Sequence, residues 1–139
     1  MRRGITLIEI TLVVAVLGIV ALVAMARFMA LRDRIATRGA ANDVVAVFAL
    51  ARHSALLRAE AAFVALDTAR GTAMVVAGRD TIAMRPLRYL HGVSLSATRD
   101  SMAYAPTGLG YGAANLRVIA RRGAAEETVW VSRLGRVRR

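Results

Sequence analysis

The chain has 139 residues, a length that suits one domain of ordinary size. Its formal net charge is +11, and all 20 basic residues are arginine because the sequence contains no lysine. Hydrophobic residues make up 57% of the chain, which argues against an intrinsically disordered protein. The lack of cysteine excludes disulfide scaffolds and thiolate metal sites, and two histidines are too few for a multi-histidine metal centre.

The N-terminal region contains a long apolar run. Residues 10–26 form a stretch of 17 residues without a formal charge. Extended back to Ile5, the run has 22 residues, about 33 Å as a helix at ~1.5 Å per residue, which is enough to span a bilayer. A secretory signal peptide would have a shorter apolar stretch, so this segment is predicted to be retained.

Glu9 is the one acidic residue inside this run. A carboxylate at membrane depth costs several kcal/mol unless it is paired. One interpretation is a protonated glutamate near the membrane interface. The other is a carboxylate paired with a cation: cleavage after Gly4 would create an α-amino group on Ile5, which could meet Glu9 of a neighbouring chain in a parallel assembly of helices.

Gly4-Ile5-Thr6-Leu7-Ile8-Glu9, followed by a long apolar helix, resembles the class III signal of type IV pilins and type II secretion pseudopilins. The resemblance implies that prepilin peptidase cleaves between Gly4 and Ile5 and that Ile5 is then N-methylated. It also implies that Glu9 pairs with the N-terminus of an adjacent subunit during filament assembly. Other pilins or pseudopilins, the peptidase and inner-membrane lipid are the partners it implies.

Three further positions bear on the resemblance. Gly18 matches a glycine that is common in these helices. Ile5 stands where the family usually has Phe, which is a tolerable apolar exchange. Ala26 stands where many pilins have a helix-kinking proline, so a straighter helix is expected here.

The flanking charges and the resemblance disagree about orientation. Arg2 and Arg3 precede the apolar run, whereas four arginines follow it, namely Arg27, Arg32, Arg34 and Arg38. The positive-inside rule would therefore place the N-terminus outside. The resemblance implies the opposite orientation, which we adopt: a single-pass bacterial inner-membrane protein with its C-terminal domain in the periplasm, later assembled in a pilus or pseudopilus.

The pattern after Ala26 predicts one long helix that continues to about Arg58 or Glu60, with Gly39 as its weak point. The predicted parts are a leader at 1–4, a transmembrane or filament-core half-helix at 5–26, an amphipathic half-helix at 27–60 and a β-domain at 61–139. Short apolar runs between turn residues predict strands at 62–67, 73–77, 81–84, 93–98, 101–105, 116–121, 128–131 and 136–138. The predicted fold class is therefore α+β, a long N-terminal pilin-like helix followed by a small antiparallel β-sheet domain.

The C-terminal half carries a second resemblance. Residues 104–108, Tyr-Ala-Pro-Thr-Gly, and residues 129–138, which end in Gly-Arg-Val-Arg, look like the GspH/FimT branch of minor pseudopilins. Residues 61–101 match this branch only in their general pattern of short β-like runs separated by turn residues. GspH members are minor components of the secretion pseudopilus, and in FimT members the terminal Gly-Arg-x-Arg stretch is associated with DNA binding in DNA uptake.

The C-terminal arginines are the candidate DNA-binding residues. Ten arginines from residue 85 onward, against Asp100, Glu126 and Glu127, give the last 55 residues a net charge of +7. Six of them are expected to form one cationic patch near the terminal strands: Arg121, Arg122, Arg133, Arg136, Arg138 and Arg139. The arginine fork matches phosphate, so such a patch would bind double-stranded DNA without reading sequence. The competing interpretation is that these arginines lie on an ordinary solvated face. The use of arginine at every basic position would then reflect a GC-rich genome.

No catalytic constellation is predicted. His53 and Ser54 are adjacent and so point about 100° apart on a helix, which prevents a nucleophile–base pair. His91 lies in an expected turn, and the Gly108–Gly112 segment has neither a dinucleotide-binding nor a P-loop pattern and is expected to be a flexible loop. We expect a non-enzymatic protein without cofactor or metal. An ordinary single-span protein with a β-domain is disfavoured by the short leader and Glu9.

Overall fold

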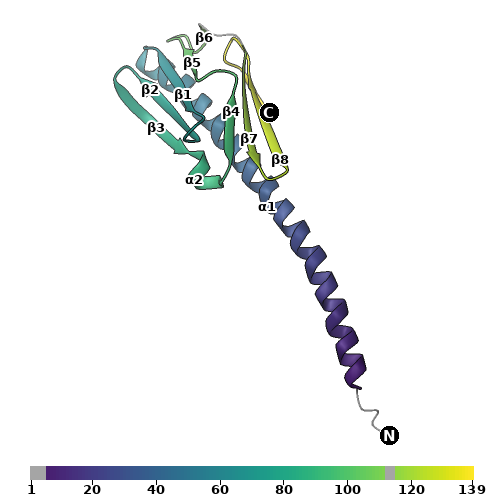
Figure 1. Ribbon diagram of the computed structural model, residues 1–139. Helices are drawn as coiled ribbons and strands as arrows, with labels where there is room; N and C mark the ends of the chain where they lie inside the picture. Colours follow the sequence, from purple (N-terminus) through teal and green to yellow (C-terminus); the bar gives the residue numbers. More distant parts are fainter. Residues whose placement is uncertain (1–5, 112–114) are drawn as a thin grey trace. The chain divides into compact units, whose positions relative to one another are not determined.

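A computed structural model describes residues 6–111 and 115–139, and the chain divides into two compact units, Met1–Arg32 and Asp33–Arg139. We call them the N-terminal unit and the C-terminal unit. Helix α1, Leu7–Arg58, belongs to both and continues without interruption through Gly18, Ala26 and Gly39 (Figure 1). The predicted α+β class is confirmed, because α1 is followed by antiparallel sheets.

The described part of the N-terminal unit is helix alone from Leu7 onward. All of its side chains from Thr6 to Arg32 are exposed, including Leu7 at 83% and Leu22 at 74%. Among the described residues, α1 is the one helix long and apolar enough to cross a membrane. Within residues 6–111 and 115–139, no other part of the chain covers this apolar surface.

In the C-terminal unit, α1 buries one face at helical spacing. The buried apolar residues on this face are Ala40, Ala41, Val44, Val47, Phe48, Ala51 and Ala55. The helix ends at Arg58, and Ala59 follows in the left-handed region with φ 50°, a conformation that commonly ends helices.

Two antiparallel sheets complete the C-terminal unit. The first has the order β3-β2-β1-β5-β6, and the second has the order β4-β7-β8-β9. The strands of the first sheet are β1 (Ala62–Asp67), β2 (Thr72–Ala77), β3 (Asp80–Pro86), β5 (Ser101–Tyr104) and β6 (Gly110–Tyr111). Those of the second are β4 (Ser94–Ala97), β7 (Leu116–Arg122), β8 (Ala125–Val131) and β9 (Val137–Arg138).

All eight strands predicted from the sequence are present, and two elements were missed. Helix α2, Leu87–His91, has five residues, too few to show a helical period. His91 therefore ends a helix, with Gly92 as its left-handed cap, and does not lie in the simple turn that was expected. The expectation of a loop at 108–112 is wrong for Gly110 and Tyr111, which pair with Tyr104 and Ala103 as β6; Gly112 lies outside the described residues.

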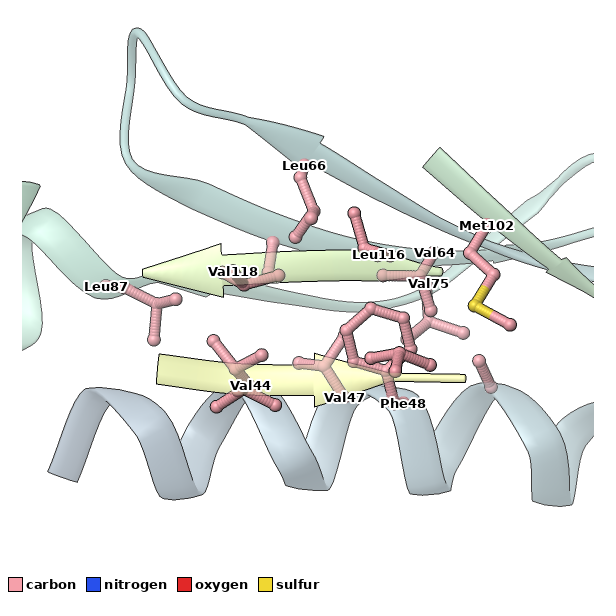
Figure 2. Close-up of a cluster of buried hydrophobic side chains, with 14 of the residues drawn as sticks. Val44, Val47, Phe48, Val64, Leu66, Val75, Leu87, Met102, Leu116 and Val118 are labelled. Carbon is pink, nitrogen blue, oxygen red and sulfur yellow. The ribbon is translucent and has the colours of Figure 1, made fainter. Parts of the chain in front are cut away.

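The core lies where the buried face of α1 meets both sheets. In Figure 2, Val44, Val47 and Phe48 of α1 point toward side chains from the strands. These are Val64, Leu66, Val75, Met102, Leu116 and Val118, with Leu87 of α2 at one side. Full burial of one such aliphatic or aromatic side chain contributes about 1.5–3 kcal/mol, so this cluster is the main stabilising feature of the unit.

Tyr104 ties the two sheets together. Its side chain is fully buried, and its hydroxyl donates a hydrogen bond of 3.0 Å to the carbonyl oxygen of Gly135 in the β8–β9 connection. Gly135 has φ 81°, and any side chain there would collide with the Tyr104 ring. Burial raises the pKa of Tyr104 to about 12, against an opposing pull from the Arg52 guanidinium.

Candidate functional site

Of the predicted processing residues, Gly4 and Ile5 lie outside the described residues, whereas Glu9 lies in the first turn of α1. The backbone N–H of Glu9 donates to the Thr6 carbonyl oxygen at 3.1 Å and lies 3.3 Å from the Thr6 hydroxyl oxygen. Thr6 therefore caps the helix. The cleavage and methylation sites stay predictions.

Glu9 carries the one acidic side chain among many exposed apolar ones. It is exposed, and within residues 6–111 and 115–139 no basic side chain forms an ion pair with it. The next charged residue along the chain is Arg27, 18 positions later. The positive end of the helix dipole supports a carboxylate in the first turn, and a cation from another molecule would complete the pairing.

At the start of the C-terminal unit, four side chains form a clasp: Asp33, Asp43, His91 and Arg122. The Arg122 Nε atom lies 3.0 Å from Asp33 Oδ1, and Arg122 Nη1 donates to the carbonyl oxygen of His91. The His91 ring lies 2.8 Å from Asp43 Oδ2 and packs over Gly39, where a Cβ atom would approach it to 2.8 Å. His91 and Arg122 therefore fasten α2 and β7 to α1.

The six candidate arginines are divided, and do not form the single patch expected from the sequence. Arg121 and Arg122 end β7 beside the β7–β8 turn, whereas Arg133, Arg136 and Arg138 follow the far end of β8. The register places Arg121 opposite Glu126 and Leu116 opposite Val131, so the two ends of the hairpin are about 17 Å apart at ~3.4 Å per residue.

Their electrostatic partners differ as well. Arg121 pairs with Glu126, Arg122 with Asp33, and Arg139 with Glu127 at 3.5 Å. In the part of the chain that the structure describes, Arg133, Arg136 and Arg138 have no ion pair with an acidic side chain. These three are therefore the candidates that keep their charge available to a ligand.

Arg138 belongs to a row of three exposed side chains across the second sheet, which we call the arginine–tryptophan row. Its members, Arg117 of β7, Trp130 of β8 and Arg138 of β9, lie directly opposite one another in register. The Arg117 guanidinium lies over the Trp130 ring, 5.5 Å from its centroid. Trp130 is 50% exposed, and its neighbours Val129 and Val131 are buried.

Arg117 and Trp130 are not among the candidate DNA-binding residues predicted from the sequence. Arg117 stands between Leu116 and Val118, and Trp130 stands between Val129 and Val131, so each lies at the outward position of an alternating strand pattern. What the sequence did not supply was the register that brings Arg117, Trp130 and Arg138 together.

The residues considered for catalysis do not form a site: His53 and Ser54 lie on different faces of α1, and His91 holds α2 to α1. His53 is exposed, whereas Ser54 is buried on the core side of α1. Among the described residues there is no group of three or more histidine and acidic residues able to hold a metal ion. The expectation of no catalytic site and no cofactor stays a prediction.

The long N-terminal helix and its antiparallel β-domain define a type IV pilin fold. Two solved structures, two crystal forms of the type IV minor pilin FimU of Pseudomonas aeruginosa, are similar to this chain. The first has a TM-score of 0.61 and covers 73% of this chain and 86% of FimU; the second has a TM-score of 0.59 and covers 73% and 90%. Both are 10% identical in sequence, so the likeness is one of fold.

No family model matches the sequence, and no curated protein does either. The similarity confirms the pilin-like fold that the resemblance of the N-terminal motif implies. Placement in the GspH/FimT branch stays a prediction, because it rests on residues 104–108 and 129–138 alone.

Proposed function

We propose that the chain is a minor pilin or pseudopilin of a type IV pilus or type II secretion system. It is cleaved by prepilin peptidase between Gly4 and Ile5, methylated on Ile5 and assembled through its N-terminal helix. The observation that carries the proposal is Glu9, a carboxylate in the first turn of a helix whose apolar side chains from Leu7 to Met25 are exposed in the described structure. The pilin fold supports the same reading.

In this proposal the apolar half of α1 has two successive environments. Before assembly it anchors the protein in the inner membrane with the C-terminal unit in the periplasm, and afterwards it packs against the helices of other subunits. The new amino group on Ile5 of one subunit then neutralises Glu9 of its neighbour. A paired carboxylate is tolerated in an apolar core, whereas an unpaired one is strongly disfavoured.

The test is co-assembly of Glu9 variants in cells that carry the machinery. Glu9→Ala is expected to reach the membrane at wild-type levels but to be lost from sheared filaments, because the residue that selects the neighbour's amine is gone. Asp100→Ala, which removes an exposed acid in the C-terminal unit, is the matched control and is expected to assemble normally. Equal recovery of both variants in filaments would refute the role given to Glu9.

A second candidate function is a DNA-binding minor pilin for DNA uptake. It is favoured by Arg133, Arg136 and Arg138, which are exposed and make no ion pair within the described residues. In Gly135-Arg136-Val137-Arg138, the half-buried Val137 packs against the core between two exposed arginines, so both guanidinium groups face solvent.

The DNA-binding candidate is tested by titrating the full chain in detergent with labelled duplex DNA at several salt concentrations. Binding is expected to weaken with salt and to fall in Arg136→Ala/Arg138→Ala, since each lost phosphate contact lowers the salt slope by about 1. The charge-matched control is Arg79→Ala/Arg99→Ala, two exposed arginines elsewhere on the C-terminal unit. An equal loss in both variants would mean that net charge alone binds DNA.

A further inference from the structure

We propose that the arginine–tryptophan row, Arg117, Trp130 and Arg138, is a stacking site for the unpaired bases of a single-stranded nucleic acid. The inference rests on the second candidate function above and names the form of nucleic acid that the site takes. It adds Arg117 and Trp130 to the terminal arginines, with Arg117 and Trp130 stacking on bases and the terminal arginines contacting phosphate.

The first observation is the placement of an aromatic ring on an open sheet face. Trp130 is 50% exposed although it is the largest side chain in the sheet and its own strand has Val129 and Val131 in the core. Base–aromatic stacking contributes about 1–3 kcal/mol per base and tolerates any sequence, because every base has a π-face. A half-exposed indole is the surface that such stacking needs.

The second observation is the pair of arginines on either side of the ring. Arg117 lies over one face of the indole, 5.5 Å from its centroid, so on that side of the ring a base would stack on the planar guanidinium. Bases stack on arginine planes as well as on aromatic rings. Arg138, in register on the other side of Trp130, supplies a fork for the backbone phosphate of the same nucleotide or the next.

The third observation is the distribution of acidic residues on this face. Along β8 the outward positions are Trp130, Thr128 and Glu126, so the nearest outward acid on this strand is four residues from Trp130, about 14 Å at ~3.4 Å per residue. Glu126 is itself paired with Arg121. Glu127 points to the other side, where it meets Arg38 and Arg139. In the described part of the chain, no acidic side chain forms an ion pair with Arg117 or Arg138, so the row keeps its positive charge.

A shallow hollow beside the row gives the base a place to sit. It has a volume of about 250 Å³ and is lined by Asn115, Trp130, Val131, Ser132, Arg136 and Arg138. Duplex DNA keeps its bases stacked inside the helix, so it can use the arginines of this surface but not the indole face. The row therefore favours single strands over duplexes of the same length.

Trp130 is the sole tryptophan of the chain, so its fluorescence reports the site directly. The experiment titrates the full-length protein in detergent micelles with oligothymidylate, with a duplex of the same length and with inorganic polyphosphate. Oligothymidylate is expected to quench the emission and to bind more tightly than the duplex. Polyphosphate, which has charge but no base, is expected to bind without quenching.

Variants separate stacking from charge. Trp130→Ala is expected to lose about tenfold in affinity for labelled oligothymidylate, the equivalent of ~1.4 kcal/mol and within the range of one stacked base, and to keep its duplex affinity. Trp130→Phe retains a ring and is expected to recover most of the loss. Because Trp130 is half-exposed and flanked by buried valines, neither variant removes a core residue.

The outcomes distinguish this inference from the function on which it rests. Equal affinity for single strand and duplex, unchanged in Trp130→Ala, would overturn the stacking site while leaving the arginine surface as a DNA-binding site. No binding of either nucleic acid at low salt would overturn both.

Discussion

The two units of the chain share one helix and treat apolar side chains in opposite ways. In the C-terminal unit Phe48 is fully buried, whereas in the N-terminal unit Phe28 is 65% exposed. The C-terminal unit folds around its own core. The described part of the N-terminal unit is a helix whose side chains pack against no other described part of the chain. In the function we propose, lipid and then neighbouring helices cover the apolar side chains of the N-terminal unit, and Glu9 is its one acidic side chain.

The largest effect that sharpens this comparison is expected from the two phenylalanines. Phe48→Ala should lower the free energy of unfolding of the C-terminal unit by about 3–5 kcal/mol, through lost transfer energy and a cavity facing both sheets. Phe28→Ala should leave it unchanged. The measurement is urea unfolding of the full chain in detergent, followed by Trp130 fluorescence. Similar losses in both variants would break the distinction between the units.

The next effect concerns Tyr104 at alkaline pH. Burial raises the pKa of Tyr104 from its ordinary value of 10.0 to about 12, so the folded state holds the neutral phenol more strongly than the unfolded state does. The stability this gives is fully present below pH 10 and is lost as the pH rises from about 10 to about 12, by about 1–3 kcal/mol. The midpoints of unfolding curves measured at pH values from about 10 to about 12 should therefore fall as the pH rises.

Tyr104→Phe is the variant that checks the assignment. It should flatten the alkaline decline and lower stability at neutral pH by about 1 kcal/mol, since the Gly135 carbonyl oxygen loses its donor. The chain has no lysine or cysteine, so few other groups titrate in this range. Tyr89→Phe, at a position 88% exposed, is the control and should behave as the wild type. An alkaline decline that persists in Tyr104→Phe would contradict the account.

The smallest effect is expected at Asp33, the first residue of the C-terminal unit. Asp33→Ala removes the ion pair with Arg122 and should destabilise this unit by about 0.5–1 kcal/mol, because both side chains keep about a quarter of their exposure to water. Asp100→Ala removes an exposed acid and serves as the comparison. If thermal unfolding followed by circular dichroism gave the same midpoint for both, the clasp would have no measurable part in holding the start of the unit.

Much of the fold was readable from the sequence because its signals are local. The uninterrupted apolar run predicted the N-terminal half of α1, and alternation such as that at 116–121 predicted strands whose bounds differ from the observed ones by three residues at most. Helix α2 and strand β6 were missed because five-residue and two-residue elements show no period. Which arginines share a surface depends on strand register, a non-local property, so Arg122 was included although Asp33 holds it, and Arg117 was omitted.

We propose that the N-terminal helix is processed for assembly, and the sequence of the mature N-terminus is the measurement that decides it. The chain would be expressed in cells with active prepilin peptidase, purified from the membrane and sequenced at its N-terminus by mass spectrometry. We expect a chain that begins at Ile5 with a methylated α-amino group, and no such product when the peptidase is deleted. An intact chain beginning at Met1 or Arg2 in the presence of active peptidase would contradict it.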